Sequence, residues 1–153
     1  MQSSPAIKAL GIVHKAMMAG QILFAACCIF LYTSGSITVI APEMDRPLQI
    51  AAVLLAAIGF FASTAIFKKR MLAARDGGGT AKEKFESYRA ACLMQWALLE
   101  GPGLFCIIAF FLTGNYAFLA LTGLLVLLMA MTGPAKEKIQ LQLGLSEQEI
   151  SEL

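Results

Sequence analysis

Charged residues are scarce in this sequence. Only 14% of its 153 residues are Asp, Glu, Lys or Arg, whereas soluble domains carry about 25%. Hydrophobic residues make up 58% of the chain, and the mean hydropathy is +0.72. This composition excludes an ordinary soluble domain and is typical of a polytopic membrane protein, whose main partner is the lipid bilayer. The basic residues form short clusters at the ends of apolar runs, so we expect no nucleic-acid partner.

The sequence is equally poor in residues and motifs that carry chemistry. Its single histidine, His14, cannot supply two haem ligands within one chain. The glycine-rich stretch that begins at Asp76 lacks the GxxxxGK[ST] pattern of a phosphate-binding loop. The cysteines form no CxxC pair and lie inside apolar runs, where cysteine is usually a small buried hydrophobe. They are Cys27, Cys28, Cys92 and Cys106. We therefore expect no metal, no cofactor and no catalytic residues, which favours a non-enzymatic protein.

Long apolar runs are what the sequence does have. They cover residues 10–33, 48–67, 90–113 and 116–132. A helix of about 20 residues crosses a hydrocarbon core of roughly 30 Å. The runs are continuous rather than alternating, which favours helices over barrel strands. The fourth run is the shortest and should stand nearly upright or use flanking residues. We predict one all-α membrane domain over residues 1–153, a four-helix bundle built from two transmembrane hairpins.

The basic residues predict the orientation of these helices. With four spans, eleven of the 12 Lys and Arg residues fall on one side, and Arg46 alone falls on the other. Lys and Arg near transmembrane ends favour the cytoplasm. Both termini are therefore expected in the cytoplasm of a bacterial cell, with the bundle in its inner membrane. The first apolar run lacks the pattern of a cleaved signal peptide, and we expect it to be retained as a helix.

A short tail, residues 134–153, follows the fourth run. Ser146 and Glu149 match a capping box, which marks the start of a short helix. Leu145, Ile150 and Leu153 are placed to dock that helix on its own bundle. A tail that binds a partner is the alternative.

An internal repeat is a further hypothesis. A shift of 81 residues places Ala16 on Ala97 and Gly20 on Gly101. Both hairpins start on the same side, so the repeat would be parallel, about an axis along the membrane normal. Chance similarity between two Leu- and Ala-rich helices is the alternative.

Glu100 is the strongest anomaly in the sequence. It lies ten residues into the third run, roughly 15 Å from its start and near the midplane. A carboxylate there is costly and usually faces a bundle interior or a wet cavity. Burial away from water favours its neutral form. Gly101, Pro102 and Gly103 follow directly, and Pro102 has no N–H for the carbonyl of Leu98, which predicts a helix kink.

Few other polar residues lie within the apolar runs. Gln21 is at about the depth of Glu100 on the first run, and Gln95 lies one to two turns nearer the cytoplasm. His14 shares a helix face with Gln21 through its i,i+7 spacing. We therefore predict an ion or polar site between the first and third helices, made of Glu100, Gln21, Gln95 and His14. The alternatives are an interfacial His14 and a Glu100 that serves as a structural hydrogen-bonding group.

The sequence resembles an uncharacterised family of small four-span bacterial membrane proteins. The resemblance rests on Gly20-Gln21, on the segment from Trp96 to Phe105 and on the tail segment that starts at Pro134. It covers most of the chain and implies the fold without an activity. A weaker resemblance is to the duplicated proteolipid of rotary ATPases, in which Glu100 would stand for the midplane carboxylate. Here the carboxylate is on the first helix of its hairpin, where that family places it on the second.

Two functions are compatible with these features. The first is an accessory or partner-binding subunit of a membrane complex, whose partners are other membrane subunits or further copies of this chain. The second is a proton- or ion-linked transport component that uses Glu100. Co-purification of a stoichiometric partner would favour the first, and activity of the isolated chain in liposomes would favour the second.

Overall fold

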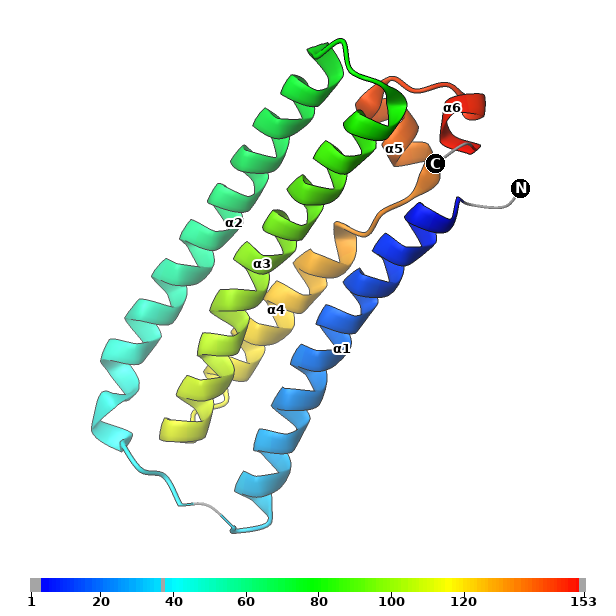
Figure 1. Cartoon of the computed structure of the whole chain (residues 1–153). Coiled ribbons are helices and arrows are strands. Elements are labelled where there is room, and N and C mark those ends of the chain that lie inside the picture. Colours follow the sequence, from blue (N-terminus) through cyan, green and yellow to red (C-terminus); the bar gives the residue numbers. More distant parts are fainter. Residues whose placement is uncertain (1–3, 37, 152–153) are drawn as a thin grey trace.

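The computed structural model describes residues 4–36 and 38–151 and is 85% helical. The described residues contain no strand, so the predicted all-α class is confirmed (Figure 1). The described residues form six α-helices, because the tail adds two short helices to the four of the bundle. The α-helices are α1 (Pro5–Thr33), α2 (Asp45–Asp76), α3 (Ala81–Thr113), α4 (Ala117–Met131), α5 (Lys136–Leu143) and α6 (Glu147–Ser151), and a 3-10 turn, η1 (Pro42–Met44), precedes α2.

The long helices extend beyond the predicted apolar runs. α1 begins five residues earlier than expected, at Pro5, because Ser4 caps it by accepting a hydrogen bond from the N–H of Ile7 at 3.4 Å. α3 begins nine residues before its apolar run, at a capping box in which Thr80 and Glu83 bond each other's backbone N–H groups. Polar residues thus carry these helices past the apolar region, which periodicity of the apolar residues alone does not reveal.

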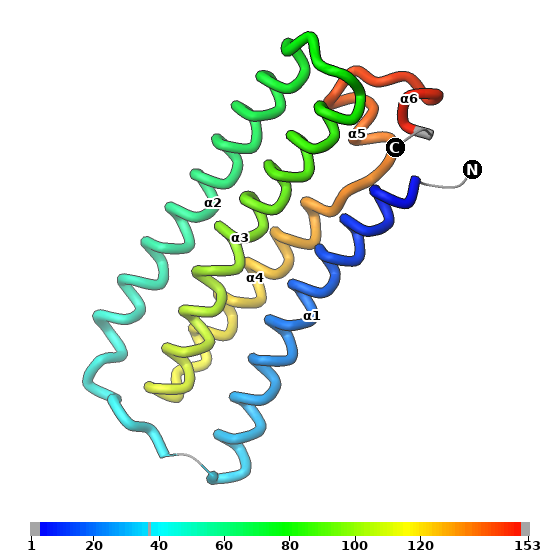
Figure 2. Tube along the Cα trace, viewed as in Figure 1, coloured from blue at the N-terminus to red at the C-terminus, as the bar shows by residue number. Residues whose placement is uncertain are grey.

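α3 is the centre of the bundle. It packs against α1, α2 and α4, whereas α1 and α2 lie on opposite sides of it and scarcely touch (Figures 1 and 2). The predicted second hairpin is therefore a tightly packed pair, α3 and α4, and the predicted first hairpin is not. This packing therefore does not support two equivalent hairpins, and it does not support the internal repeat.

Three helices are long and apolar enough to cross a membrane: α1, the stretch Pro42–Asp76 and α3. Their length and composition are those of a membrane protein. α4 has only 15 residues, about 22 Å, and passes the same test only together with α5, from which it is bent by 70°. The outer surface is correspondingly apolar, with residues such as Phe30 (69% exposed) on α1 and Phe61 (68%) on α2.

The tail closes one end of the bundle. Ile139, Leu143 and Ile150 are fully buried in the larger of the two apolar clusters, so the tail docks on its own bundle, as predicted. The Ser146 and Glu149 capping box is confirmed by the hydrogen bond from the Ser146 N–H to Glu149 Oε2 at 2.8 Å. This bond and the one from the Ser146 hydroxyl lower the pKa of Glu149. Leu153 lies outside the described residues.

Candidate functional site

α1 contacts the bundle through one narrow stripe. Its buried residues include Ile7, His14, Gln21 and Cys28, which recur at intervals of seven. Seven residues make nearly two helical turns, so these side chains lie on one face. Two of the four are polar, at the only face by which α1 is attached. The structure thus buries His14 and Gln21 on one face of α1, and an ion or polar site made by them stays a prediction.

α1 and α3 run parallel in a fixed register. The His14 ring lies 4.6 Å from the Trp96 ring, the Gln21 amide lies against Gly103, and the Tyr32 hydroxyl lies close to Gly114. The partners in each pair are 82 residues apart, so a residue of α1 is level with the α3 residue 82 positions later. Glu100 is therefore level with Met18, one turn from the level of Gln21.

Gln21 occupies the junction of three helices. It is 1% exposed, and neither its Oε1 nor its Nε2 has a hydrogen-bond partner among the described residues. A Cβ on Gly103 would overlap the Gln21 amide, so glycine leaves the space that this side chain occupies in the structure. Thr122 of α4 donates a hydrogen bond to the Gly103 carbonyl at 3.3 Å. The buried amide therefore sits unpaired where α1, α3 and α4 meet.

Pro102 and its neighbours form a packing surface rather than a break in α3. The helix continues through Pro102, which cannot donate to the Leu98 carbonyl. α2 packs directly on that carbonyl: a Cβ on Gly59 would lie 2.5 Å from the Leu98 oxygen and 3.0 Å from Pro102 Cγ. Gly101 is exposed, and a Cβ added there would meet nothing within 4 Å, so the three predicted kink residues face different surroundings.

Glu100 is half-buried at the edge of the exposed strip of α3. Ala97 and Gly101, which flank it on that strip, are exposed. Glu100 makes no hydrogen bond or ion pair with any described residue, and it lines none of the principal grooves. Neither Gln21 nor Gln95 forms a hydrogen bond with Glu100 among the described residues. Glu100 therefore lies at the border between the α1 side of α3 and its exposed strip, and not in a closed interior.

Gln95 belongs to another face of α3. It is buried, together with Tyr88 and Cys92, on the side away from Glu100. Residues five apart on a helix point about 140° from each other, so Gln95 and Glu100 cannot line one site. The prediction that Gln95 joins Glu100 was wrong because depth along the helix was considered without the angle around it.

His14 has a structural partner that the sequence did not reveal. The His14 Nε2–H donates a hydrogen bond to the Met129 carbonyl at 2.9 Å, since a carbonyl can only accept. The Thr132 hydroxyl also donates to this carbonyl, and the Trp96 Nε1–H donates to the Thr132 carbonyl at 3.4 Å. His14 and Trp96 thus satisfy carbonyls at the carboxyl end of α4. His14 is 5% exposed and is therefore buried within the bundle.

The described residues contain no cluster of three or more His, Cys, Asp or Glu that could hold a metal ion. The cysteines are free, with Cys27 exposed and the other three buried. No protein-family model, curated protein or solved structure matches this chain. The two resemblances inferred from the sequence therefore stay predictions, and the geometry of the site carries the functional argument.

Proposed function

We propose that this protein is a binding subunit of a membrane complex, and that its partner packs a transmembrane helix against α3 at Glu100. The observation that carries the proposal is a half-buried carboxyl group in an apolar stretch, with no partner among the described residues. Such groups are costly in a bilayer and normally pair with another polar group. Because Glu100 lies at the edge of the exposed strip of α3, we favour a helix of a partner protein as the source of that polar group.

The surface around Glu100 suits close helix contact. Ala97 and Gly101 are exposed and one turn apart, and small residues at this spacing let a second backbone approach. The partner then has a hydrogen-bond donor or a basic side chain at the depth of Glu100. A second copy of this chain would bring two Glu100 carboxyls together, which requires that at least one of them is protonated. A different subunit is therefore the better match.

The proposal includes an orientation. We place both termini in the cytoplasm of a bacterial inner membrane, with four spans of which α4 is the last and with the tail, residues 134–153, in the cytoplasm. Reporter fusions should place Gly78 in the cytoplasm and Gly35 outside. Finding both positions on the same side would contradict the four-span arrangement.

Site-specific photocrosslinking in intact membranes tests the partner. A photoreactive residue at Ala97 should give one discrete protein adduct, which Glu100→Leu abolishes and Glu100→Gln weakens less because it keeps a hydrogen-bonding group. The control position is Ile58, 63% exposed on α2, whose adducts should not respond to changes at Glu100. An adduct of twice the chain's mass would identify a second copy. Lipid adducts alone at Ala97, or an adduct indifferent to Glu100→Leu, would contradict the proposal.

Ion-linked transport is the second candidate. The observation that favours it is the unpaired Gln21 amide, one turn from the level of Glu100. A transported ion or a chain of water molecules would bind first one and then the other of the Gln21 amide and the Glu100 carboxyl. The purified chain in liposomes should then dissipate a pH gradient, and Glu100→Gln should abolish this flux without impairing folding. Equal flux from the Gln variant would rule out proton chemistry at Glu100.

A further inference from the structure

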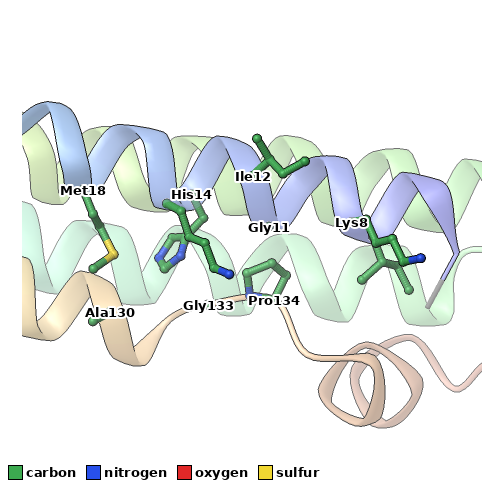
Figure 3. A pocket seen from close by; sticks show the side chains of 10 residues that line it. Lys8, Gly11, Ile12, His14, Met18, Ala130, Gly133 and Pro134 are labelled. Carbon is green, nitrogen blue, oxygen red and sulfur yellow. The ribbon is translucent and has the colours of Figure 1, made fainter. Parts of the chain in front are cut away.

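A groove runs between α1 and the segment that joins α4 to α5. Its volume is about 690 Å³. Figure 3 shows Lys8 at one end, Met18 at the other, and His14 and Pro134 between them. The groove lies at the end of the bundle where α4 stops short, so its floor is formed by the link after α4 instead of by a fourth helix.

The charge in the groove is entirely basic. Lys8 and Lys15 line it, seven residues apart, which places them on one side of α1 about 10 Å apart along its axis. No Asp or Glu is among the lining residues, and neither lysine forms an ion pair within the described part of the chain. Lys136, by contrast, pairs with Glu147 at 3.8 Å. The groove therefore presents two uncompensated ammonium groups.

The rest of the groove is apolar and open to the outer surface of α1. Ile12, 67% exposed, lies on the outer side of α1 at the edge of the groove, and Met18 lies at the end opposite Lys8 (Figure 3). The His14 Nε2–H is already used by the Met129 carbonyl, so the imidazole is held rigidly in the wall. The groove thus combines a basic mouth with an apolar wall that continues into the exposed apolar face of α1.

We propose that this groove binds an anionic phospholipid, with the phosphate between Lys8 and Lys15 and an acyl chain along Ile12 and Met18. A lysine that lies below the lipid headgroups extends its ammonium group toward them. Lys15 therefore reaches the phosphate from below, and Lys8 reaches it from the other side. Basic pockets beside transmembrane helices on the cytoplasmic side bind anionic headgroups in this way. The proposal depends on the chain being embedded in a membrane, and it is independent of the partner at Glu100.

Lipid retention by the purified protein tests this proposal. The protein in neutral detergent is mixed with phosphatidylglycerol or with phosphatidylcholine, and bound lipid is counted by native mass spectrometry. Phosphatidylglycerol should be retained in preference to phosphatidylcholine. Lys8→Ala with Lys15→Ala should weaken that retention about 30-fold, since each lysine near an anionic surface contributes roughly a factor of five. The matched control, Lys68→Ala with Lys69→Ala, removes the same charge from α2 and should leave retention unchanged.

Two further variants separate charge from shape. Lys8→Arg with Lys15→Arg should preserve retention. Ile12→Trp keeps both charges, alters an exposed position and should displace the acyl chain, so it also tests the groove if the double Ala variant does not fold. Equal losses in the α1 and α2 double variants, or equal retention of the two lipids, would overturn the proposal. Displacement by glycerol phosphate without acyl chains would identify a phosphate site and reject the lipid.

Discussion

The two sides of α3 show different ways of bringing helices together. On the α2 side, Gly59 lies on the Leu98 carbonyl and the Pro102 ring, so one backbone packs against another. On the α1 side, Gly103 admits the Gln21 side chain, whose amide has no partner among the described residues. Glycine creates the space in both cases. The α2 contact at Gly59 is made of packed atoms alone, whereas the α1 contact at Gly103 leaves the Gln21 amide without a hydrogen-bond partner among the described residues.

This difference means that the position of α2 is fixed by its own packing, whereas the position of α1 depends on further interactions. α2 meets atoms that cannot move without bending α3. α1 touches the bundle along a narrow stripe that contains two polar side chains, and it lies beside the unpaired Glu100. α1 is thus the helix whose position a ligand or partner can stabilise, because an unpaired buried polar group costs free energy until it finds a partner.

The largest expected effect is at Gly59. Gly59→Ala places a methyl group 2.5 Å from the Leu98 oxygen, and neither backbone can yield cheaply. We expect a loss of about 3 kcal/mol in the free energy of unfolding, measured in micelles by steric trapping. The control Gly101→Ala meets nothing within 4 Å and should be nearly neutral. Similar values for the two variants would show that the α2 contact is not rigid.

The equivalent change on the α1 side should cost less. Gly103→Ala collides with the end of a flexible side chain, which can rotate away, so we expect a loss of about 1.5 kcal/mol. In a double-mutant cycle, Gln21→Ala should recover most of that loss, because it removes the colliding atoms. Additive losses would indicate that the space around Gly103 is closed by something other than Gln21.

The hydrogen bond from His14 to the carboxyl end of α4 gives the next test. His14→Phe keeps a ring against Trp96 but removes the hydrogen bond to the Met129 carbonyl. We expect a loss of about 1 kcal/mol in unfolding free energy. Hydrogen exchange should rise in the last turn of α4 and stay unchanged in α2. Unchanged exchange in α4 would show that the Thr132 hydroxyl alone suffices at this carbonyl.

Gln21→Met should have the opposite sign. The two side chains are similar in shape, and the change removes an amide that has no partner among the described residues. We expect a gain of up to about 1 kcal/mol in unfolding free energy. A loss of stability would mean that bound water or a ligand satisfies the amide, and it would strengthen the case for transport.

The smallest effect lies in the tail, away from both contacts. The Ser146 hydrogen bonds lower the pKa of Glu149 in the folded state, so their contribution is present above the pKa of an unfolded Glu, about 4.3. It is lost as the pH falls through the lower folded value. Protease cleavage in α6 should rise with acid over that window, and Glu149→Gln should remove the pH dependence. Cleavage that rises equally in the Gln variant would assign the effect to other groups.

Sequence reasoning found the helices and the polar side of the bundle. Apolar runs identified four long helices because the bilayer requires length and continuity, and the His14 and Gln21 spacing identified the inward face of α1. The position of Glu100 at the border of the exposed strip was not predictable, since it depends on where α1 sits beside α3. The bond from His14 to α4 joins residues 115 apart, and no local pattern encodes it.

The early end of α4 has a consequence for the order in which the protein is made. α4 stops at Met131, and the buried residues Ile139 and Leu143 cover that end of the bundle. Ile139 and Leu143 follow α4 in the chain, whereas His14 and Trp96, which bond the terminal carbonyls of α4, precede it. The groups that receive the end of α4 are therefore synthesised before α4, and the residues that cover that end are synthesised after it.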